Sequence, residues 1–407
     1  MAEDAKAEKL KSEKHEKIAV IKLDYRRKKC GDYGMMYVWQ NASWPKWLCD
    51  FERLNPLLRD LRMEVGRLQG RMDMIGLEAR GRARLETVVA EAMQTSAIEG
   101  EVLNPAAVRS SAARRLGLET AGFSPVDRVA DGVVEMVWDA MRNTGEPLTE
   151  ERLLGWHAAL FPTGYSGTSR IKVAGWRDDA IGPMRVVSGE IGRERVHYEA
   201  PPADRIPSEM RIFLEWINSN GKDLDPFVKA GRAHLWFEVL HPFEDGNGRI
   251  GRAIVEWLLA KAVGESDSGF FSISRQMERE RRDYYRQLEM SSRGDLNDEL
   301  WLGWFLDCIK RAIKNAEETL DGVLKKARFW NKWAGVALNE RQSAMLNKLL
   351  DGFNGKLNSS KWAKIMKCSP DTALRDLSDL VAKGILLKAE GGGRGTNYVF
   401  QEIGTSE

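Results

Sequence analysis

A short run in the middle of the sequence gathers the residue types that bind phosphate and move protons. HPFEDGNGR covers residues 241–249, and a second arginine, Arg252, follows almost one helical turn later. The run supplies a histidine that titrates near neutral pH, a carboxylate, two glycines around an asparagine and a guanidinium group. These types together are typical of phosphoryl or nucleotidyl transfer, which uses a phosphate cradle, cations and a base. A P-loop is excluded, because no GxxxxGK[ST] sequence occurs.

Apolar residues at three-to-four spacing predict a helix on each side of this run. The loop would be fixed between two packed helices, and its glycines would open the second helix. Free backbone N–H groups and the positive end of the helix dipole make that position an anion site. The residues that set the spacing are Phe227, Ala230, His234, Phe237 and His241 before the loop, and Ile250, Ile254, Trp257 and Leu258 after it.

The charged residues of the run surround this expected anion site. Arg249 and Arg252 lie about one turn apart on the second helix, so both can reach the same anion. Asp245 is a hard oxygen ligand at the edge of the anion, which suits Mg²⁺, since that ion prefers one or two carboxylates plus phosphate oxygens. His241, at the end of the first helix, can take a proton at neutral pH.

The run HPFEDGNGRIGR resembles, at every defined position, the HPFx[D/E]GNGRxxR signature of the Fic (filamentation induced by cAMP) family. Family members similar to this chain are protein adenylyltransferases, which move AMP from ATP to a Ser, Thr or Tyr hydroxyl of a target protein. The resemblance implies that His241 deprotonates the target hydroxyl, that Asp245 holds Mg²⁺ and that Phe243 packs inward. The phosphate-binding residues would be Gly246, Asn247, Gly248, Arg249 and Arg252.

Two further stretches resemble parts of this family. Strands are predicted at 184–187 and 195–199, and their hairpin resembles the Fic flap, whose edge strand docks the target backbone by strand addition. RRDYYRQLEMSSRGD, residues 281–295, resembles the adenosine-binding helix, although Ser292 stands where an asparagine is often found. Ordinary core packing is the alternative for its two tyrosines. These stretches add Val196, His197, Tyr198, Glu199, Tyr284 and Tyr285 to the expected nucleotide-binding residues.

The stretch TSAIEG, residues 95–100, ends another expected helix and resembles the [S/T]xxxE[G/N] inhibitory motif of Fic proteins. A carboxylate in the last turn of a helix is disfavoured by the dipole, so Glu99 would gain from pairing with Arg252. That pair would compete for the arginine that positions the γ-phosphate of ATP. The resemblance therefore implies that Glu99 and Thr95 are inhibitory residues.

The pattern along the chain predicts a mainly α protein with several parts. Residues 1–33 are rich in Lys and Glu and predict a charged tail. Residues 34–110 predict an N-terminal helical domain, in which Ser43 caps a helix that has Pro45 in its first turn. Residues 111–330 predict a Fic helical core that carries the β-hairpin flap.

Residues 335–407 predict a winged-helix module, with three short helices followed by two strands around the tip EGGGRG. Arg375, Lys383 and Arg394 would be its phosphate contacts if it binds DNA. Its ten basic and eight acidic residues give only a weak field. Winged helices also serve in protein docking and in dimers, so DNA binding and a homodimer both remain open.

Composition narrows the class of protein. The net charge of +2 argues against wholesale coating of nucleic acid, and the lack of a run of about 18 apolar residues predicts no membrane span. The cysteines lie far apart in the sequence and predict unpaired thiols in a reducing, cytoplasmic compartment. They are Cys30, Cys49, Cys308 and Cys368.

The favoured hypothesis is a nucleotidyltransferase, a protein adenylyltransferase that Glu99 inhibits. One alternative within the same fold is an enzyme that uses another donor or removes AMP, with Glu99 helping to activate water. A second alternative, from a different functional class, is a DNA-binding regulator whose Fic domain only senses nucleotide. His241 and Asp245 argue against that regulator, because a sensor needs no base.

Overall fold

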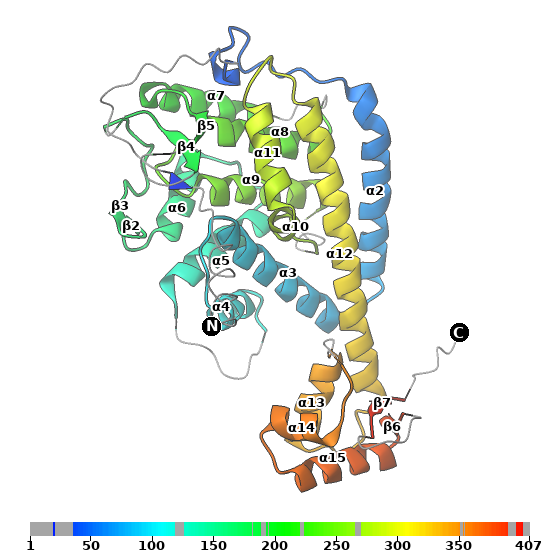
Figure 1. Cartoon of the computed structure of the whole chain (residues 1–407). Helices are drawn as coiled ribbons and strands as arrows, with labels where there is room; N and C mark the ends of the chain where they lie inside the picture. The colour runs from blue at the N-terminus through cyan, green and yellow to red at the C-terminus, as the bar shows by residue number, and fades with distance from the viewer. Residues whose placement is uncertain are drawn as a thin grey trace. The chain divides into compact units, whose positions relative to one another are not determined.

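The computed structural model describes residues 19–20, 36–118, 126–180, 182–188, 193, 195–219, 224–264, 270–350, 353, 355–389 and 396–401. Within them the fold is mainly α, as expected. The chain divides into two compact units, residues 1–317 and 318–407, which we describe separately (Figure 1). The domain limits expected from the sequence stay a prediction. Cys30, most of the tail 1–33, most of the SGEIGRE connection and the tip 390–395 with Arg394 lie outside the described residues.

Helices make up most of the first unit, and short strands form small sheets beside them. The helices are α2 (Phe51–Asp73), α3 (Leu77–Ile98), α4 (Pro105–Arg115), α5 (Arg128–Arg142), α6 (Glu150–Leu160), α7 (Ile206–Asn218), α8 (Pro226–Leu240), α9 (Asn247–Val263), α10 (Ile273–Arg279), α11 (Arg281–Ser291) and α12 (Glu299–Lys332), which continues into the second unit. The shorter elements are β1 (Ala19–Val20), η1 (Val38–Gln40), β2 (Tyr165–Ser166), β3 (Ser169–Arg170), β4 (Arg185–Ser188), β5 (Arg195–Glu199) and η2 (Ala203–Arg205).

The pair α8 and α9 forms the centre of the first unit. Asp225 caps α8 by accepting the Phe227 N–H, and Pro226 fits the first turn, where no backbone donor is needed. Both helices are buried on nearly every side, and α5 and α6 pack against α9. The helix α3 also packs against α9, and it contacts α4, α5 and α10 as well. The loop between α8 and α9 is therefore enclosed by packed helices.

The first long helix, α2, begins later than the sequence suggested. Asp50 caps it by accepting the Glu52 N–H at 3.1 Å. The expected cap at Ser43 is wrong, because Ser43 and Pro45 lie in a turn before the helix. From Phe51 onward a buried stripe of leucines and valine keeps helical spacing, and ion pairs join α2 to α12, which runs beside it (Figure 1). Burial of this stripe decides where the helix starts.

The predicted hairpin is present as antiparallel β4 and β5. The expected tail contributes β1, which pairs with the other side of β4, so the order is β1-β4-β5. On the outer side of β5, Arg293 Nη2 donates to the His197 carbonyl at 2.8 Å and Trp39 Nε1 donates to the Glu199 carbonyl at 2.9 Å. Each edge of the hairpin thus has a partner from this chain.

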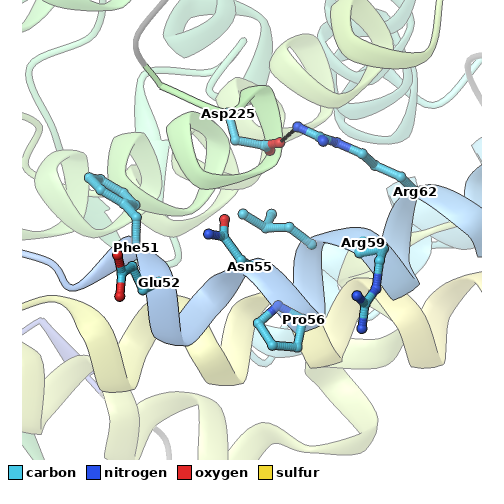
Figure 2. A pocket seen from close by; sticks show the side chains of 8 residues that line it. Phe51, Glu52, Asn55, Pro56, Arg59, Arg62 and Asp225 are labelled. Carbon is cyan, nitrogen blue, oxygen red and sulfur yellow. Dashed lines mark hydrogen bonds and ion pairs between the residues drawn. The ribbon is translucent and has the colours of Figure 1, made fainter.

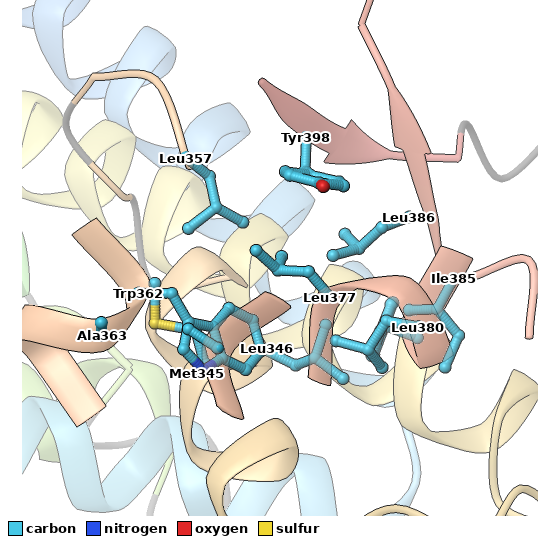
Figure 3. Close-up of a cluster of buried hydrophobic side chains, with 12 residues drawn as sticks. Met345, Leu346, Leu357, Trp362, Ala363, Leu377, Leu380, Ile385, Leu386 and Tyr398 are labelled. Atoms are coloured by element: carbon cyan, nitrogen blue, oxygen red, sulfur yellow. The ribbon is translucent and has the colours of Figure 1, made fainter. Parts of the chain in front are cut away.

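The second unit has its own apolar core around Trp362, Leu346 and Leu377 (Figure 3). Lys383 is paired with Asp379 at 2.5 Å, whereas Arg375 is exposed. The assignment as a winged helix stays a prediction, although the element order agrees with it. The elements are α13 (Glu340–Leu350), α14 (Ser359–Met366), α15 (Pro370–Ala382) and the antiparallel strands β6 (Leu386–Lys388) and β7 (Tyr398–Phe400).

Composition predicted that the chain has no membrane span and that its cysteines are unpaired. In the part that the structure describes, no helix is long and apolar enough to cross a membrane. Cys49, Cys308 and Cys368 are free thiols.

Close packing of α5 on α6 predicts the effect of one added methyl group. A Cβ at Gly132 would collide with the Ala159 carbonyl, which is rigid backbone. Gly132→Ala should lower the free energy of unfolding by about 1–3 kcal/mol. Gly155→Ala on α6 is the control, because its Cβ would meet nothing within 4 Å, and it should be neutral or stabilise by up to about 1 kcal/mol. Urea unfolding of both variants checks this, and equal effects would contradict it.

Candidate active site

His241 ends α8 with a left-handed backbone (φ 47°, ψ 57°), which is uncommon for a residue with a Cβ. The residue is 7% exposed, and neither ring nitrogen has a hydrogen-bond partner among the described residues. Burial, and then the positive charge of Arg177, lower the pKa of His241 to about 4. The imidazole is therefore neutral at neutral pH and can accept a proton from an incoming group.

The loop after His241 is closed by its own side chains. Phe243 N donates to Asn247 Oδ1, and Asn247 Nδ2 donates to the Phe243 carbonyl, both at 2.9 Å. Phe243 is fully buried, as the resemblance implied. Asn247 was expected to bind phosphate, but its side chain is used in holding the loop, which leaves only its backbone for an anion.

A histidine that sequence reasoning missed supports this loop. The His157 ring stacks on Phe243 with 4.3 Å between ring centroids. His157 Nδ1 accepts the Ala174 N–H, so Nε2 carries the hydrogen and donates to the Asp245 carbonyl, each at 3.1 Å. Burial lowers the pKa of His157 to about 4, which keeps this donor and acceptor pattern fixed. No pattern in the sequence indicates this role, because His157 lies in α6 and reaches the loop only through a contact across 88 residues of the chain.

The first turn of α9 is an anion site that already contains a carboxylate. Gly246 precedes the helix with φ 84°, and the Ile250 N–H makes the first bond, to Gly246 O at 3.0 Å. The N–H groups of residues 247–249 therefore have no partner within the helix. A Cβ at Gly248 would collide with Glu99 Oε1. The Glu99 carboxylate lies where the sequence predicts a bound phosphate.

Arg252 holds that carboxylate in place. Its Nη2 lies 2.8 Å from Glu99 Oε1, while its Nε donates to Thr95 Oγ1 and its Nη2 to the Thr95 carbonyl, also at 2.8 Å. Arg252 is only 1% exposed. Because a buried guanidinium is costly without a partner, Glu99 and Thr95 are the groups that make its burial tolerable. The structure thus brings together the residues that the inhibitory motif predicted.

The other arginine has a carboxylate partner that sequence reasoning missed. Arg249 is 1% exposed, and its Nη1 donates to Glu101 Oε2 at 2.6 Å. Burial raises the pKa of the Glu101 carboxyl, and the nearby Arg249 opposes that rise. The sequence TSAIEGE contains Glu101 two residues after Glu99, and this second acid was the feature that could have indicated the pair. Gly100 separates the two acids with φ 79° and turns the chain.

Asp245 is the residue that could hold a metal ion. Its partly exposed carboxylate accepts a hydrogen bond from Ser166 and lies 3.7 Å from Arg249 Nη2. No group of three His, Cys, Asp or Glu that could bind a metal occurs in the described part of the chain. A single carboxylate nevertheless fits Mg²⁺, which takes its other ligands from phosphate oxygens and water.

The residues expected on the flap are placed differently from one another. Val196 is 39% exposed, whereas Tyr198 is buried and donates to the Val239 carbonyl at 2.7 Å. His197 lies between Ser188 Oγ and Glu289, and Glu199 pairs with Arg185. Only Val196 thus offers an exposed apolar side chain. The nucleotide-binding role of these residues stays a prediction.

The two expected tyrosines lie against the site from α11. Tyr284 is 1% exposed and hydrogen-bonded to His234 Nε2 at 2.8 Å, which favours the alternative of core packing. Tyr285 is half-buried and donates to the Ile98 carbonyl at 3.2 Å, at the end of α3. Their contact with adenosine stays a prediction.

A surface hollow between α2 and the start of α8 is lined by residues such as Phe51, Arg59 and Asp225 (Figure 2). Arg62 and Asp225 form an ion pair across it. None of the predicted site residues lines this hollow. It therefore does not belong to the site built around α9.

Comparison with known proteins agrees with the motif. Residues 147–259 match the Fic/DOC family, and residues 37–118 match a domain of unknown function (DUF4172). Together with the curated protein adenylyltransferases below, the Fic/DOC match supports a Fic family protein.

This chain spans only a fifth to a third of the length of two curated relatives. A probable protein adenylyltransferase of Aquifex aeolicus is 38% identical over 64 residues, 16% of this chain and 20% of that protein. The protein adenylyltransferase Fic of Nematostella vectensis is 30% identical over 148 residues, 33% of each chain. A solved Fic family protein from Desulfovibrio desulfuricans has a TM-score of 0.48 at 21% identity, covering 86% of this chain and 97% of that one.

A buried pair of acids joins α3 to α9 next to the site. Glu91 and Glu256 are 1% and 3% exposed. Glu91 accepts hydrogen bonds from Ser272 Oγ at 2.6 Å and from the Ser274 N–H at 3.1 Å. Burial, and then the adjacent Glu91, raise the pKa of Glu256 well above its usual value. This shift favours the protonated form of Glu256, which would be able to donate to Glu91.

This pair predicts how stability depends on pH. The pKa of Glu256 is higher in the folded chain than the value of about 4.3 in the unfolded chain. Its contribution to stability is complete below that unfolded value and is lost as pH rises through the folded pKa. Glu256→Gln keeps a donor for Glu91 but cannot ionise, so the variant should lose less stability between about pH 5 and pH 9.

The measurement is the free energy of urea unfolding across that pH range. Glu86→Gln is the control, because Glu86 is a partly exposed glutamate of α3 that pairs with Arg109. The control should keep the wild-type pH dependence. The same dependence in Glu256→Gln would show that Glu256 does not titrate in this way.

Proposed function

We propose that this chain is a protein adenylyltransferase that moves AMP from ATP to a hydroxyl group of a target protein, and that Glu99 inhibits it. One observation carries the proposal: the Glu99 carboxylate lies over the first turn of α9 and is paired with Arg252. An anion site beside two buried arginines is thus filled by the chain itself. Partial matches to proteins named protein adenylyltransferases support the activity.

In the proposed reaction the target hydroxyl attacks the α-phosphorus of ATP. A P–O bond to AMP forms as the bond to the leaving pyrophosphate breaks, and the hydroxyl proton passes to the neutral His241 imidazole. The N–H groups of residues 247–249, with Arg249 and Arg252, bind the phosphate oxygens whose charge grows. Asp245 would hold Mg²⁺, which supplies charge neutralisation for the phosphates when it is bound.

Inhibition follows from competition for Arg252. While Glu99 is paired with it, that guanidinium is not available to hold the γ-phosphate. The carboxylate also repels phosphate from the first turn of α9, because both carry negative charge. ATP that binds under these conditions takes a position that does not favour attack on its α-phosphorus.

We place the target protein at the flap. The edge strand β5 offers a backbone for strand addition, and Val196 offers an exposed apolar side chain. An incoming strand would replace the donors Arg293 and Trp39 on β5, or β1 on β4. The target is then selected by backbone shape, while the chemistry stays with the α9 loop.

Removing the Glu99 carboxylate tests the function and its inhibition. Glu99→Gly should raise incorporation of labelled AMP, including incorporation into the chain itself, by about tenfold, which corresponds to about 1.4 kcal/mol of competition removed. Adding Arg252→Ala should abolish the gain, because no arginine is liberated. Adding His241→Ala should lower the rate by about 10² to 10⁴. A Glu99→Gly protein no more active than wild type would contradict inhibition.

The Arg249–Glu101 pair predicts a second, additive gain. Glu101→Gln keeps the size of the side chain but removes the charge that Arg249 now meets. In the Glu99→Gly background it should raise AMP incorporation a few-fold further, because the second arginine becomes available to phosphate. Glu86→Gln in the same background is the matched control and should have no effect. Equal incorporation with and without Glu101→Gln would show that this pair does not restrain the site.

Docking at the flap predicts a selective loss of target labelling. Val196→Pro breaks the pairing of Val196 with Val187 and should lower labelling of a target about tenfold, equivalent to about one lost hydrogen bond. Binding of ATP should change less, because the α9 loop is untouched. Val196→Thr keeps the backbone donor and a β-branched side chain, so it should label the target normally. Unchanged labelling by Val196→Pro would contradict docking at this strand.

A further inference from the structure

The segment 172–177 runs along the loop that follows α8 and contacts it at several points. Lys172 N donates to Glu244 Oε2 at 3.1 Å, and Trp176 lies 5.0 Å from Phe243 between ring centroids. At its end the Arg177 N–H donates to the Pro242 carbonyl at 2.9 Å. The segment has no regular secondary structure of its own, so these contacts define its path.

Arg177 makes the contacts closest to the expected base. Its side chain is fully buried, and its Nε donates to the His241 carbonyl at 2.8 Å. Its Nη2 donates to the Pro201 carbonyl just after β5, and its Nη1 donates to Asp179 at 2.9 Å. One guanidinium therefore joins the turn at His241 to the end of the flap.

The imidazole of His241 lacks the support that a base usually has. Catalytic histidines are commonly oriented by a carboxylate on the second ring nitrogen. Here both ring nitrogens are without a hydrogen-bond partner within the described residues. The backbone at His241 is in the left-handed region, where conformations need support from their surroundings. The placement of the ring therefore depends on the backbone that carries it. The Arg177 guanidinium donates to the His241 carbonyl, and the Arg177 backbone N–H donates to the Pro242 carbonyl.

We infer that Arg177 is the positioning residue of this site: it orients His241 through the backbone and couples its position to the end of the flap. This inference rests on the proposed function, because it takes His241 as the base. Arg177 acts through its contacts with His241, Pro242 and Pro201, and none of the residues expected to bind phosphate is among its partners. A strand added to the flap would then be sensed at the base through a single side chain.

The charges around His241 agree with this role. Arg177 is the cation that disfavours an imidazolium, after burial itself. Asp245 and the backbone of Glu238 act in the opposite direction, since both raise the pKa of His241. Asp179 partly balances Arg177, to which it is paired. Removal of the guanidinium charge should therefore raise the pKa of His241, which stays below its usual value because the ring is still buried.

The test compares Arg177→Met and Arg177→Lys in the active Glu99→Gly background. Loss of positioning should lower kcat about 10- to 100-fold in both variants, with KM for ATP within about twofold of the parent because the α9 anion site is intact. NMR titration of the His241 ring gives a readout that does not need activity. Arg177→Met should raise its pKa, whereas Arg177→Lys, which keeps the charge, should not. The His241→Ala spectrum assigns the signal.

Arg232→Met is the matched control for loss of a buried arginine. Arg232 lies in α8 and its Nε is 2.6 Å from the buried Asp298. The Arg232→Met variant should have a lower melting temperature, while its kcat and the titration of His241 should be unchanged. A kcat in Arg177→Lys equal to that of the parent, or the same losses in Arg232→Met as in Arg177→Met, would overturn the inference. If the parent transfers no AMP, the proposed function fails, while an unchanged His241 titration in Arg177→Met would refute the role of Arg177 by itself.

Discussion

The positive first turn of α9 is the constraint on which the rest of the site depends. It presents backbone N–H groups without partners in the helix, and Arg249 and Arg252 add two buried charges within about one turn. Buried charges of one sign are costly unless acids or bound anions meet them. Glu99 and Glu101 provide those acids from the end of α3 and the residues just after it. The position of that segment is therefore determined by charge compensation as well as by apolar packing.

Two helix ends of opposite polarity meet at this point. Glu99 is the C-cap of α3, where the helix dipole disfavours its negative charge, and it lies against the N-terminus of α9, where the dipole favours it. Nucleotide phosphate would gain from the same N-terminus and the same arginines. The carboxylate and the phosphate cannot both occupy the turn, because a Cβ at Gly248 would already collide with Glu99. Under the proposed function, the two anions would compete for this single helix end.

The motif between α8 and α9 could be predicted from sequence because its chemistry is local. Loop, glycines and flanking helices all lie within one stretch, and the Thr95–Glu99 motif needed only one long-range partner, Arg252. His157 and Arg177 could not be predicted, since their roles depend on tertiary contacts with loop carbonyls. Ser43 failed as a cap because Asp50 stands directly before the stripe that is buried. The mainly α fold could be predicted from the helical spacing of apolar residues. Burial of Tyr284 could not, because a tyrosine in a helix suits either a core or a ligand site.

Several side chains attach α3 to α9 and α10, and only one of them, Glu99, is the proposed inhibitory residue. Glu91, Thr95 and Glu99 recur at every fourth position, so they share one face of the helix. Glu91 is held by the serines that begin α10 and lies beside Glu256, whose raised pKa favours a proton shared between the two acids, and Thr95 is held by Arg252. Only Glu99, at the end of this row, reaches the first turn of α9. Displacement of its carboxylate therefore requires a change of one side chain, and the helix can stay docked through Glu91 and Thr95 while phosphate occupies the turn.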